Sequence, residues 1–217
     1  WLLDLFYPPR CGGCDRRGTL MCSQCLASLR PPRAEANHVP GLSDLVSAGI
    51  FTGPLREAIH KLKYEGDCPL SKPLAALMAD ALKTSPAWPA LETNPPVMIA
   101  VPLHREKERS RGFNQSALLV RELHYSTGWL SSSDLHRVTK TRPQVGLNME
   151  ERRKNVSGVF AWQGSAPAPE RVLLVDDVFT TGATIGECVT ALKKAGSRAV
   201  YVATVARADS AGPRAGG

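Results

Sequence analysis

The chain has 217 residues, which suits one α/β domain with a small additional module. Its hydrophobic content of 43% and charged content of 22% are ordinary for a soluble protein. No apolar run approaches the ~20 residues of a membrane-spanning helix, and no secretory signal is visible, so we expect a cytoplasmic protein without membrane insertion. The net charge of +7 favours anionic ligands such as nucleotides, pyrophosphate or nucleic acid.

Four cysteines near the start of the chain follow an apolar segment, residues 1–9, that is compatible with a short helix. Their spacing is Cys-x2-Cys-x7-Cys-x2-Cys, at Cys11, Cys14, Cys22 and Cys25. Four thiolates suit a tetrahedral structural zinc, and we expect Gly12 and Gly13 to let the first turn close tightly. Disulfides in a secreted protein and a redox Cys-x2-Cys pair are the alternatives. Because no signal peptide and no βα pattern accompany the cysteines, we expect a zinc ribbon that mainly stabilises the fold.

The next stretch indicates the start of an α/β domain. Prolines mark residues 30–43 as a linker. Apolar periodicity then predicts a strand over 45–52, followed by helices over 55–64 and 73–83. Residues 84–96 contain four prolines, so we expect a surface loop there.

A predicted strand at 97–101 leads into the charged segment REKERSRGFNQS, residues 105–116. We expect a basic loop that contacts phosphate, because arginine guanidinium groups have forked donors that match phosphate oxygens. A solvated charged loop would have the same composition. A helix is expected over 114–124.

Residues 139–160 are polar and basic and are interrupted by Pro143. This composition predicts a mobile lid between two short strands, one near 135–138 and a returning one over 156–162. Arg142, Arg152 and Arg153 would close over a bound pyrophosphate. A disordered solvated hairpin is the alternative.

The strongest motif is RVLLVDDVFTTGAT, residues 171–184. Val172–Val175 is an apolar run short enough for a buried parallel strand, and we expect Asp176 and Asp177 at its end. A loop of hydroxyl-bearing and small residues follows, and then a helical pattern that ends near Gly196. The loop residues are Thr180, Thr181, Gly182, Ala183 and Thr184.

A strand, a tight loop and a helix N-terminus form an anion site, because free backbone N–H groups and the helix dipole favour a phosphate. We expect Gly182 to adopt positive φ and to let the backbone approach the ligand. Two carboxylates accept hydrogen bonds from a vicinal diol, so a ribose 5′-phosphate satisfies both halves of the motif. The alternative is a buried strand with an acidic turn and an ordinary helix cap. A last strand is expected over 199–205.

The thirteen residues from Val172 to Thr184 resemble the phosphoribosyl pyrophosphate (PRPP) signature of type I phosphoribosyltransferases. With the cysteine pairs and the motifs RGFNQ, PQ-x2-L and R-x2-NV, nearly the whole chain resembles the ComF family. The resemblance implies an α/β fold of the type I phosphoribosyltransferase kind, with a mainly parallel sheet, flanking helices and an N-terminal zinc ribbon. We expect the ribbon and linker in residues 1–40, the main domain in 41–207 and a flexible tail in 208–217.

The resemblance also implies transfer of a 5-phosphoribosyl group with release of pyrophosphate, aided by Mg²⁺, and a link to natural competence. Single-stranded DNA and competence-machinery proteins are the expected partners besides PRPP. The acceptor is not identifiable, and a non-catalytic PRPP or nucleotide sensor or a DNA-binding accessory protein is the alternative. The expected catalytic residues are Asp176, Asp177, Arg111 and Arg152. The expected phosphate-binding residues are Thr180, Thr181, Gly182, Ala183, Thr184, His104, Arg105, Arg109, Asn114 and Gln115.

Overall fold

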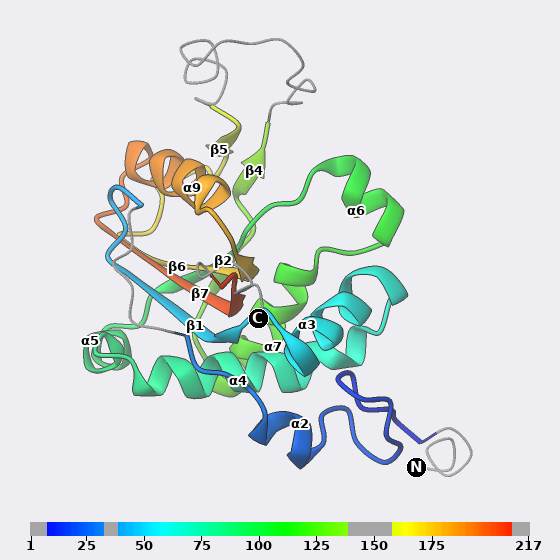
Figure 1. Cartoon of the computed structure of the whole chain (residues 1–217). Helices are drawn as coiled ribbons and strands as arrows, with labels where there is room; N and C mark the ends of the chain where they lie inside the picture. The colour runs from blue at the N-terminus through cyan, green and yellow to red at the C-terminus, as the bar shows by residue number, and fades with distance from the viewer. Residues whose placement is uncertain (1–7, 33–38, 139–157, 210–217) are drawn as a thin grey trace, which may run out of the picture.

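The computed structural model describes residues 8–32, 39–138 and 158–209. Figure 1 shows a five-stranded sheet at its centre, with the strand order β1-β7-β6-β2-β3 and parallel pairing throughout. The strands are β1 (Asp44–Ile50), β2 (Val97–Ala100), β3 (Ser131–Ser132), β6 (Arg171–Phe179) and β7 (Ala199–Arg207). The predicted α/β class and parallel sheet are therefore confirmed.

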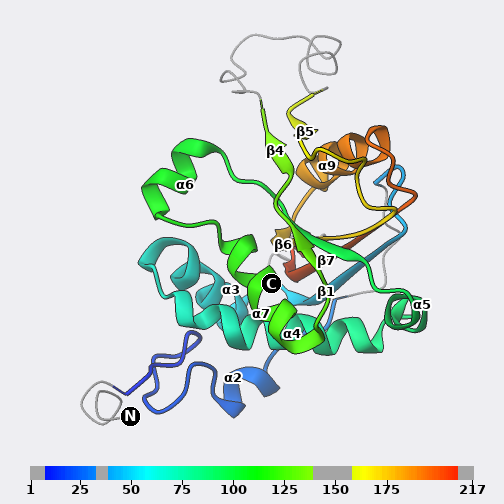
Figure 2. The same ribbon diagram turned by 180° about the vertical axis from the view of Figure 1, so that it is seen from behind.

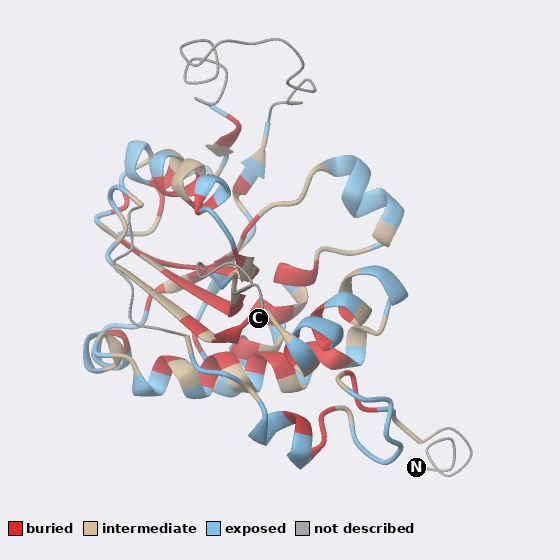
Figure 3. Cartoon of the chain, viewed as in Figure 1, coloured by how far each residue is buried: buried red, intermediate tan, exposed pale blue. Residues whose placement is uncertain are grey.

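Helices cover both faces of this sheet, as Figures 1 and 2 show. One face packs on α4 (Ser71–Thr84) and α7 (Gln115–Thr127), and the other packs on α9 (Ala183–Lys194). In β6 the side chains alternate, so that Leu173 and Val175 join the first layer, whereas Val172 and Leu174 join the second. Burial on both faces explains why this strand is a continuous apolar run (Figure 3). Among the described residues, no helix combines the length and apolarity needed to cross a membrane.

The helix expected over 55–64 is composed of two parts. Helix α3 (Gly53–His60) continues directly into a π-helical turn, η1 (Lys61–Glu65), which ends at Gly66 with φ +72°. A 3₁₀ turn, η2 (Cys68–Leu70), then leads into α4. The change of helical pitch has no signature in the sequence, yet π-helical turns frequently occur at functional sites.

Two predicted loops are helical instead. Residues 84–96 include α5 (Trp88–Thr93), whose Leu91 is buried and whose Trp88 ring stacks on Trp129 with 5.7 Å between centroids. Pro89 stands in the first turn of α5, where its missing N–H leaves no intrahelical bond unmade, so the prolines did not exclude a helix.

The charged segment that we expected to be a basic loop forms α6 (Arg105–Arg111). Acidic residues occupy its first turn and arginines its last, which complements the helix dipole. None of its residues is buried, so no apolar periodicity marked it as a helix.

A second, two-stranded antiparallel sheet pairs β4 (Leu135–Arg137) with β5 (Phe160–Trp162). These strands are the short flanking strands that we predicted, although β5 is shorter than the expected 156–162. The lid between them, with Arg142, Pro143, Arg152 and Arg153, lies outside the described residues. The same holds for most of the apolar N-terminal segment and of the C-terminal tail.

Candidate functional site

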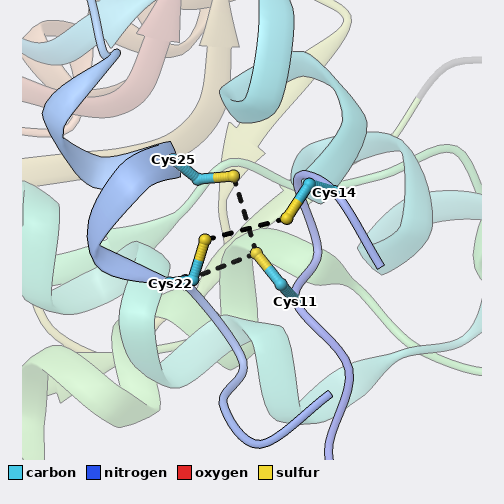
Figure 4. Close-up of side chains that lie close together, drawn as sticks. All are labelled: Cys11, Cys14, Cys22 and Cys25. Carbon is cyan, nitrogen blue, oxygen red and sulfur yellow. Dashed lines mark hydrogen bonds between the residues drawn. The ribbon is translucent and has the colours of Figure 1, made fainter. Parts of the chain in front are cut away.

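The four predicted metal ligands lie together (Figure 4). Their Sγ atoms are all within 4.8 Å of one another, and the distance is 3.7 Å both from Cys11 to Cys25 and from Cys14 to Cys22. A tetrahedral zinc with Zn–S bonds of about 2.3 Å requires S–S separations of about 3.8 Å. Cys14 is exposed and the other three are buried. The arrangement therefore fits a closed structural metal site that is compatible with zinc.

The backbone around Cys11 favours a thiolate. Burial alone would raise the pKa of Cys11, but N–H groups of Cys22, Gly13 and Cys14 point at its sulfur and lower the pKa to about 6. The N–H of Cys22 lies 3.3 Å from that sulfur. A thiolate is the form that binds metal, so this loop is preorganised for a cation.

The cysteine segment, which includes α2 (Ser23–Ala27), packs directly on the body of the protein. A Cβ on Gly12 would lie 2.7 Å from Leu70, and one on Gly13 would lie 2.6 Å from Pro54. We expected these glycines to allow a tight turn, and residues 12–14 form a turn in which the N–H of Asp15 donates a 2.9 Å hydrogen bond to the carbonyl of Cys11. Neither glycine has positive φ, and both also let the loop approach α3 and η2 closely.

Asp176 and Asp177 lie near the carboxyl end of the sheet, but they are still part of strand β6 and do not follow it. We expected the strand to end at Asp176 and Asp177, but β6 continues to Phe179 because β7 remains paired with it, with Asp176 opposite Thr204. On the other side, β2 ends at Ala100, opposite Val175. Among the described strands, none therefore pairs with this edge of β6 at the acidic pair.

The two aspartates have different surroundings. Oδ1 of Asp176 accepts hydrogen bonds from Ser116 Oγ and from the N–H of Asp177, both at 2.9 Å. Oδ1 of Asp177 lies 2.8 Å from Lys63 Nζ, and the Asp177 side chain is 5% exposed. The buried Oδ2 of Asp177 has no hydrogen-bond partner among the described residues. A buried carboxylate oxygen without a partner is unfavourable unless a ligand or cation satisfies it.

Asp176 is a strongly perturbed acid. Burial raises its pKa from the ordinary 3.8 to about 7, with a further contribution from the charge of Asp177, while Asp177 N–H, Ser116 and Lys63 oppose the rise. Strong perturbation by burial and a like charge is typical of functional sites.

This perturbation predicts a pH-dependent stability. Between pH 3.8 and about 7 the folded chain holds a proton on Asp176 that the unfolded chain has lost. The contribution of Asp176 to the free energy of unfolding should therefore be largest below that range and fall as pH rises through it. Urea unfolding of wild type and Asp176→Asn across this range measures the effect. The difference in stability between the two should change with pH; a constant difference would contradict the raised pKa.

The loop after the acidic pair has the expected geometry at its glycine. Gly182 has φ +76° and is the residue immediately before α9. A Cβ there would lie 2.8 Å from Val39 and 2.9 Å from the Phe179 ring, so close packing also requires glycine. The other four loop residues are exposed at the N-terminus of a twelve-residue helix. They are Thr180, Thr181, Ala183 and Thr184.

Several predicted phosphate contacts serve the local fold. The Nδ1 atom of His104 accepts from the N–H of Glu106 and caps α6, and Asn114 Oδ1 accepts from the N–H of Ser116 and caps α7. Gln115 is buried and accepts a 2.8 Å bond from Arg111. Phosphate contacts by these three residues remain predictions.

The arginines of α6 divide into two groups. Arg105 and Arg109 are exposed to solvent. Arg111 is turned toward η1, and its guanidinium lies 4.9 Å from the centroid of the Tyr64 ring. Arg152 lies outside the described residues.

Sequence reasoning did not identify Lys63, Tyr64 and Ser116 as residues around this site. Lys63 looks like one of several surface lysines of a helix, and its side chain reaches Asp177 from the π-helical turn. Ser116 lies sixty residues before Asp176 in the chain. Only the packing of α7 and η1 at the carboxyl end of the sheet brings these groups to the acidic pair.

Comparison with known proteins places the chain in a family, although no protein-family model matches it. The chain is 30% identical over 210 residues to competence protein F of Haemophilus influenzae, covering 91% of this chain and 90% of that protein. It is 31% identical over 196 residues to the DNA utilization protein YhgH of Salmonella typhimurium, covering 89% and 81%. Competence protein ComFC of Streptococcus pneumoniae is 28% identical over 160 residues, covering 73% and 66%. With its cysteine cluster and parallel sheet, the chain belongs to the ComF family of competence and DNA utilization proteins.

Proposed function

We propose that this protein binds PRPP and transfers its 5-phosphoribosyl group to an acceptor, with release of pyrophosphate. The observation that carries the proposal is the acidic pair at the carboxyl end of β6, followed by the threonine-rich loop and the N-terminus of α9. In open α/β sheets, ligands bind beyond the carboxyl ends of the strands.

The loop suits the 5′-phosphate of PRPP. Its exposed threonines offer hydroxyl donors, and the first turn of α9 offers N–H groups aligned with the helix dipole. Asp176 and Asp177 would accept hydrogen bonds from the ribose hydroxyls. Holding the phosphate and the ribose at fixed positions orients the ribose carbon at which transfer takes place.

The pyrophosphate would lie toward α6. Arg105 and Arg109 are exposed there, Arg111 follows on the same helix, and Arg152 is assigned to the lid. Guanidinium groups stabilise the negative charge that grows on a leaving pyrophosphate. During transfer the bond from ribose C1 to the pyrophosphate oxygen breaks, the oxygen keeps the electron pair, and the acceptor forms a new bond to C1 and loses its proton.

The acidic pair also fits Mg²⁺. The unpartnered Oδ2 of Asp177 and the raised pKa of Asp176 both indicate carboxylates that a cation would stabilise. Mg²⁺ usually binds proteins through one or two carboxylates plus substrate phosphates and waters. When bound, it would offset charge on the pyrophosphate.

The relatives named competence proteins support our proposal of a role in natural competence. The net charge of +7 and the name DNA utilization protein favour single-stranded DNA as a second candidate ligand. Direct DNA binding should weaken steeply as salt increases, because it depends on neutralised phosphates.

Thermal unfolding of the zinc-loaded protein tests PRPP binding. PRPP with Mg²⁺ at about 100 times its dissociation constant should add about 2.7 kcal/mol to the free energy of unfolding. For a chain of this size, the melting temperature should rise by about 5–10 °C. The double variant Asp176→Asn with Asp177→Asn should lose this rise, because neither amide replaces the charge at the diol and cation site.

The matched control is Glu170→Gln, an exposed carboxylate just before β6. It should keep the full rise, and zinc content should be unchanged in all variants. The compared quantity is the increment caused by PRPP, because the double variant also removes the partner of Lys63. A full increment in the double variant would refute the site assignment. No increment in the wild type would refute PRPP binding and make single-stranded DNA the next ligand to titrate.

A further inference from the structure

A cavity lies next to the acidic pair and shares Lys63 with it. It encloses about 480 Å³ between η1 and the C-terminal half of α6, a size within the usual range for small-molecule sites. In Figures 1 and 2, α6 and α3, which continues into η1, lie on the side of the molecule toward which the parallel strands point. Its lining includes Lys63, Tyr64 and Glu65 from η1 and Lys107, Arg111 and Phe113 from α6 and the residues after it.

The Lys63 side chain connects this cavity to the proposed reaction site. Lys63 lines the cavity, and its Nζ atom lies 2.8 Å from Oδ1 of Asp177. A ligand that contacts Lys63 would therefore be separated only by the Lys63 side chain from Asp177, which we assign to the ribose hydroxyls. An acceptor must reach that position to attack C1.

The charges of the lining favour an anion. Among the described residues, the lining has three cationic side chains and one carboxylate, Glu65, whose Oε1 lies 3.9 Å from His60 Nδ1. The pairing with Asp177 occupies Lys63, which leaves Lys107 and Arg111 as the groups that would bind an anion. Arg111 donates one hydrogen bond to Gln115, and a guanidinium has five N–H donors. A carboxylate matches the planar fork of that group.

The aromatic lining favours a planar ligand. Tyr64 is 64% exposed, so a ligand can reach its ring. The guanidinium of Arg111 lies over this ring, 4.9 Å from its centroid, and the His60 ring lies 4.7 Å away at an interplanar angle of 47°. A planar ligand with a negative group would stack at the exposed part of this cluster and pair with the cations beside it.

We propose that this cavity binds the acceptor of the phosphoribosyl transfer and that the acceptor is a small planar aromatic carboxylate. The proposal rests on the proposed function for its role, and Arg111, which we also assign to the pyrophosphate, would contact both ligands. The residues specific to the acceptor site are Tyr64 and Lys107, which line the cavity. Lys107 and Tyr64 would set specificity for the acceptor and take no part in holding PRPP.

Two matched pairs of probes test this on the full, zinc-loaded chain by calorimetric titration, with and without PRPP and Mg²⁺. Orotate is compared with uracil, which has the same ring without the carboxylate, and anthranilate with aniline. At least one carboxylate should bind ten or more times tighter than its uncharged partner. Tyr64→Leu and Lys107→Gln should each weaken that binding at least tenfold. The control Lys194→Gln, an exposed lysine of α9 on the opposite face of the sheet, should have no effect.

The failures of the two proposals are distinguishable. Both cavity variants should keep the wild-type increase in melting temperature with PRPP and Mg²⁺, because neither residue is assigned to PRPP. If PRPP stabilises the protein but neither carboxylate binds, or carboxylates and uncharged partners bind equally, the acceptor proposal is wrong and the PRPP proposal stands. Wild-type affinity in both variants would also overturn it. If a carboxylate binds through Tyr64 and Lys107 but PRPP does not bind, the proposed function fails and the anion site remains.

Discussion

Replacing Cys11 with serine should abolish metal binding and cause a large loss of stability. Cys11 is fully buried, and its sulfur lies 3.7 Å from that of Cys25 within the four-sulfur cluster. A structural zinc contributes its binding free energy to folding, and apparent values of about 10–16 kcal/mol are known for zinc-finger peptides. A serine oxygen is a poor substitute for a thiolate ligand at a four-sulfur zinc site.

The loss should extend beyond the cysteine segment. The buried cysteines and Met21 belong to the same apolar cluster as Leu55, Leu70 and Leu74 of the main body. Metal analysis should show a drop from about one zinc per chain to almost none, and the melting temperature should fall by more than about 10 °C. Chelation of zinc from the wild type should reproduce the loss.

Cys68→Ser is the matched control, because Cys68 is only partly buried and lies outside the cluster. It should retain zinc and nearly all of the stability. If Cys11→Ser keeps both zinc and the wild-type melting temperature, the cluster is not a structural metal site. If it loses zinc but not stability, the segment would instead serve as an attached module.

Replacing Lys63 with methionine should destabilise the fold strongly, although Lys63 looks like a surface residue in the sequence. Its ammonium group pairs with a carboxylate that is 5% exposed, and the Lys63 side chain itself is 17% exposed. Removing one partner of a buried ion pair leaves an uncompensated charge and typically costs about 3–5 kcal/mol. Urea unfolding should show a loss near the lower end of that range, because water still reaches part of Lys63.

Lys61→Met is the control for this effect. Lys61 lies two residues earlier in the same π-helical turn and pairs with Asp15, whose side chain is 64% exposed. Water can solvate Asp15 when its partner is removed, so the loss should be much smaller. Asp177→Asn in the Lys63→Met background should restore part of the stability. Equal losses for the two lysine variants, or no recovery in the double variant, would contradict the argument from burial.

The two lysines also give η1 a structural role that is not evident from either site alone. Lys61 contacts the loop that carries the metal ligands, and Lys63 contacts the acidic pair. A single π-helical turn therefore links the segment with the clustered thiols to the strand with the paired carboxylates. Gly66, with φ +72°, ends this turn in a conformation that other residues rarely adopt.

The sequence by itself determined the local features whose physics is short-range. The apolar run Val172–Val175 had to be buried on both faces, which predicted a parallel strand, and β6 confirms it. The spacing of the four cysteines predicted a metal cluster, because two short Cys-x2-Cys turns suffice to bring four sulfurs together. A tight strand-to-helix turn requires positive φ at Gly182, and the structure has φ +76° there.

The tertiary structure decided what depends on contacts between distant segments. Apolar residues three or four positions apart mark a helix only when one of its faces is buried, so the sequence of α6, which has no buried residue, predicts a loop. The extension of β6 to Phe179 comes from pairing with β7, which a reading of β6 alone cannot show. The partners of the two aspartates come from η1 and α7, which pack at the carboxyl end of the sheet. Because of this packing, Asp177 is paired with Lys63, whereas the pKa of Asp176 is raised to about 7. Such differences arise from burial and from the local electric field, which are properties of the folded chain and not of residue order.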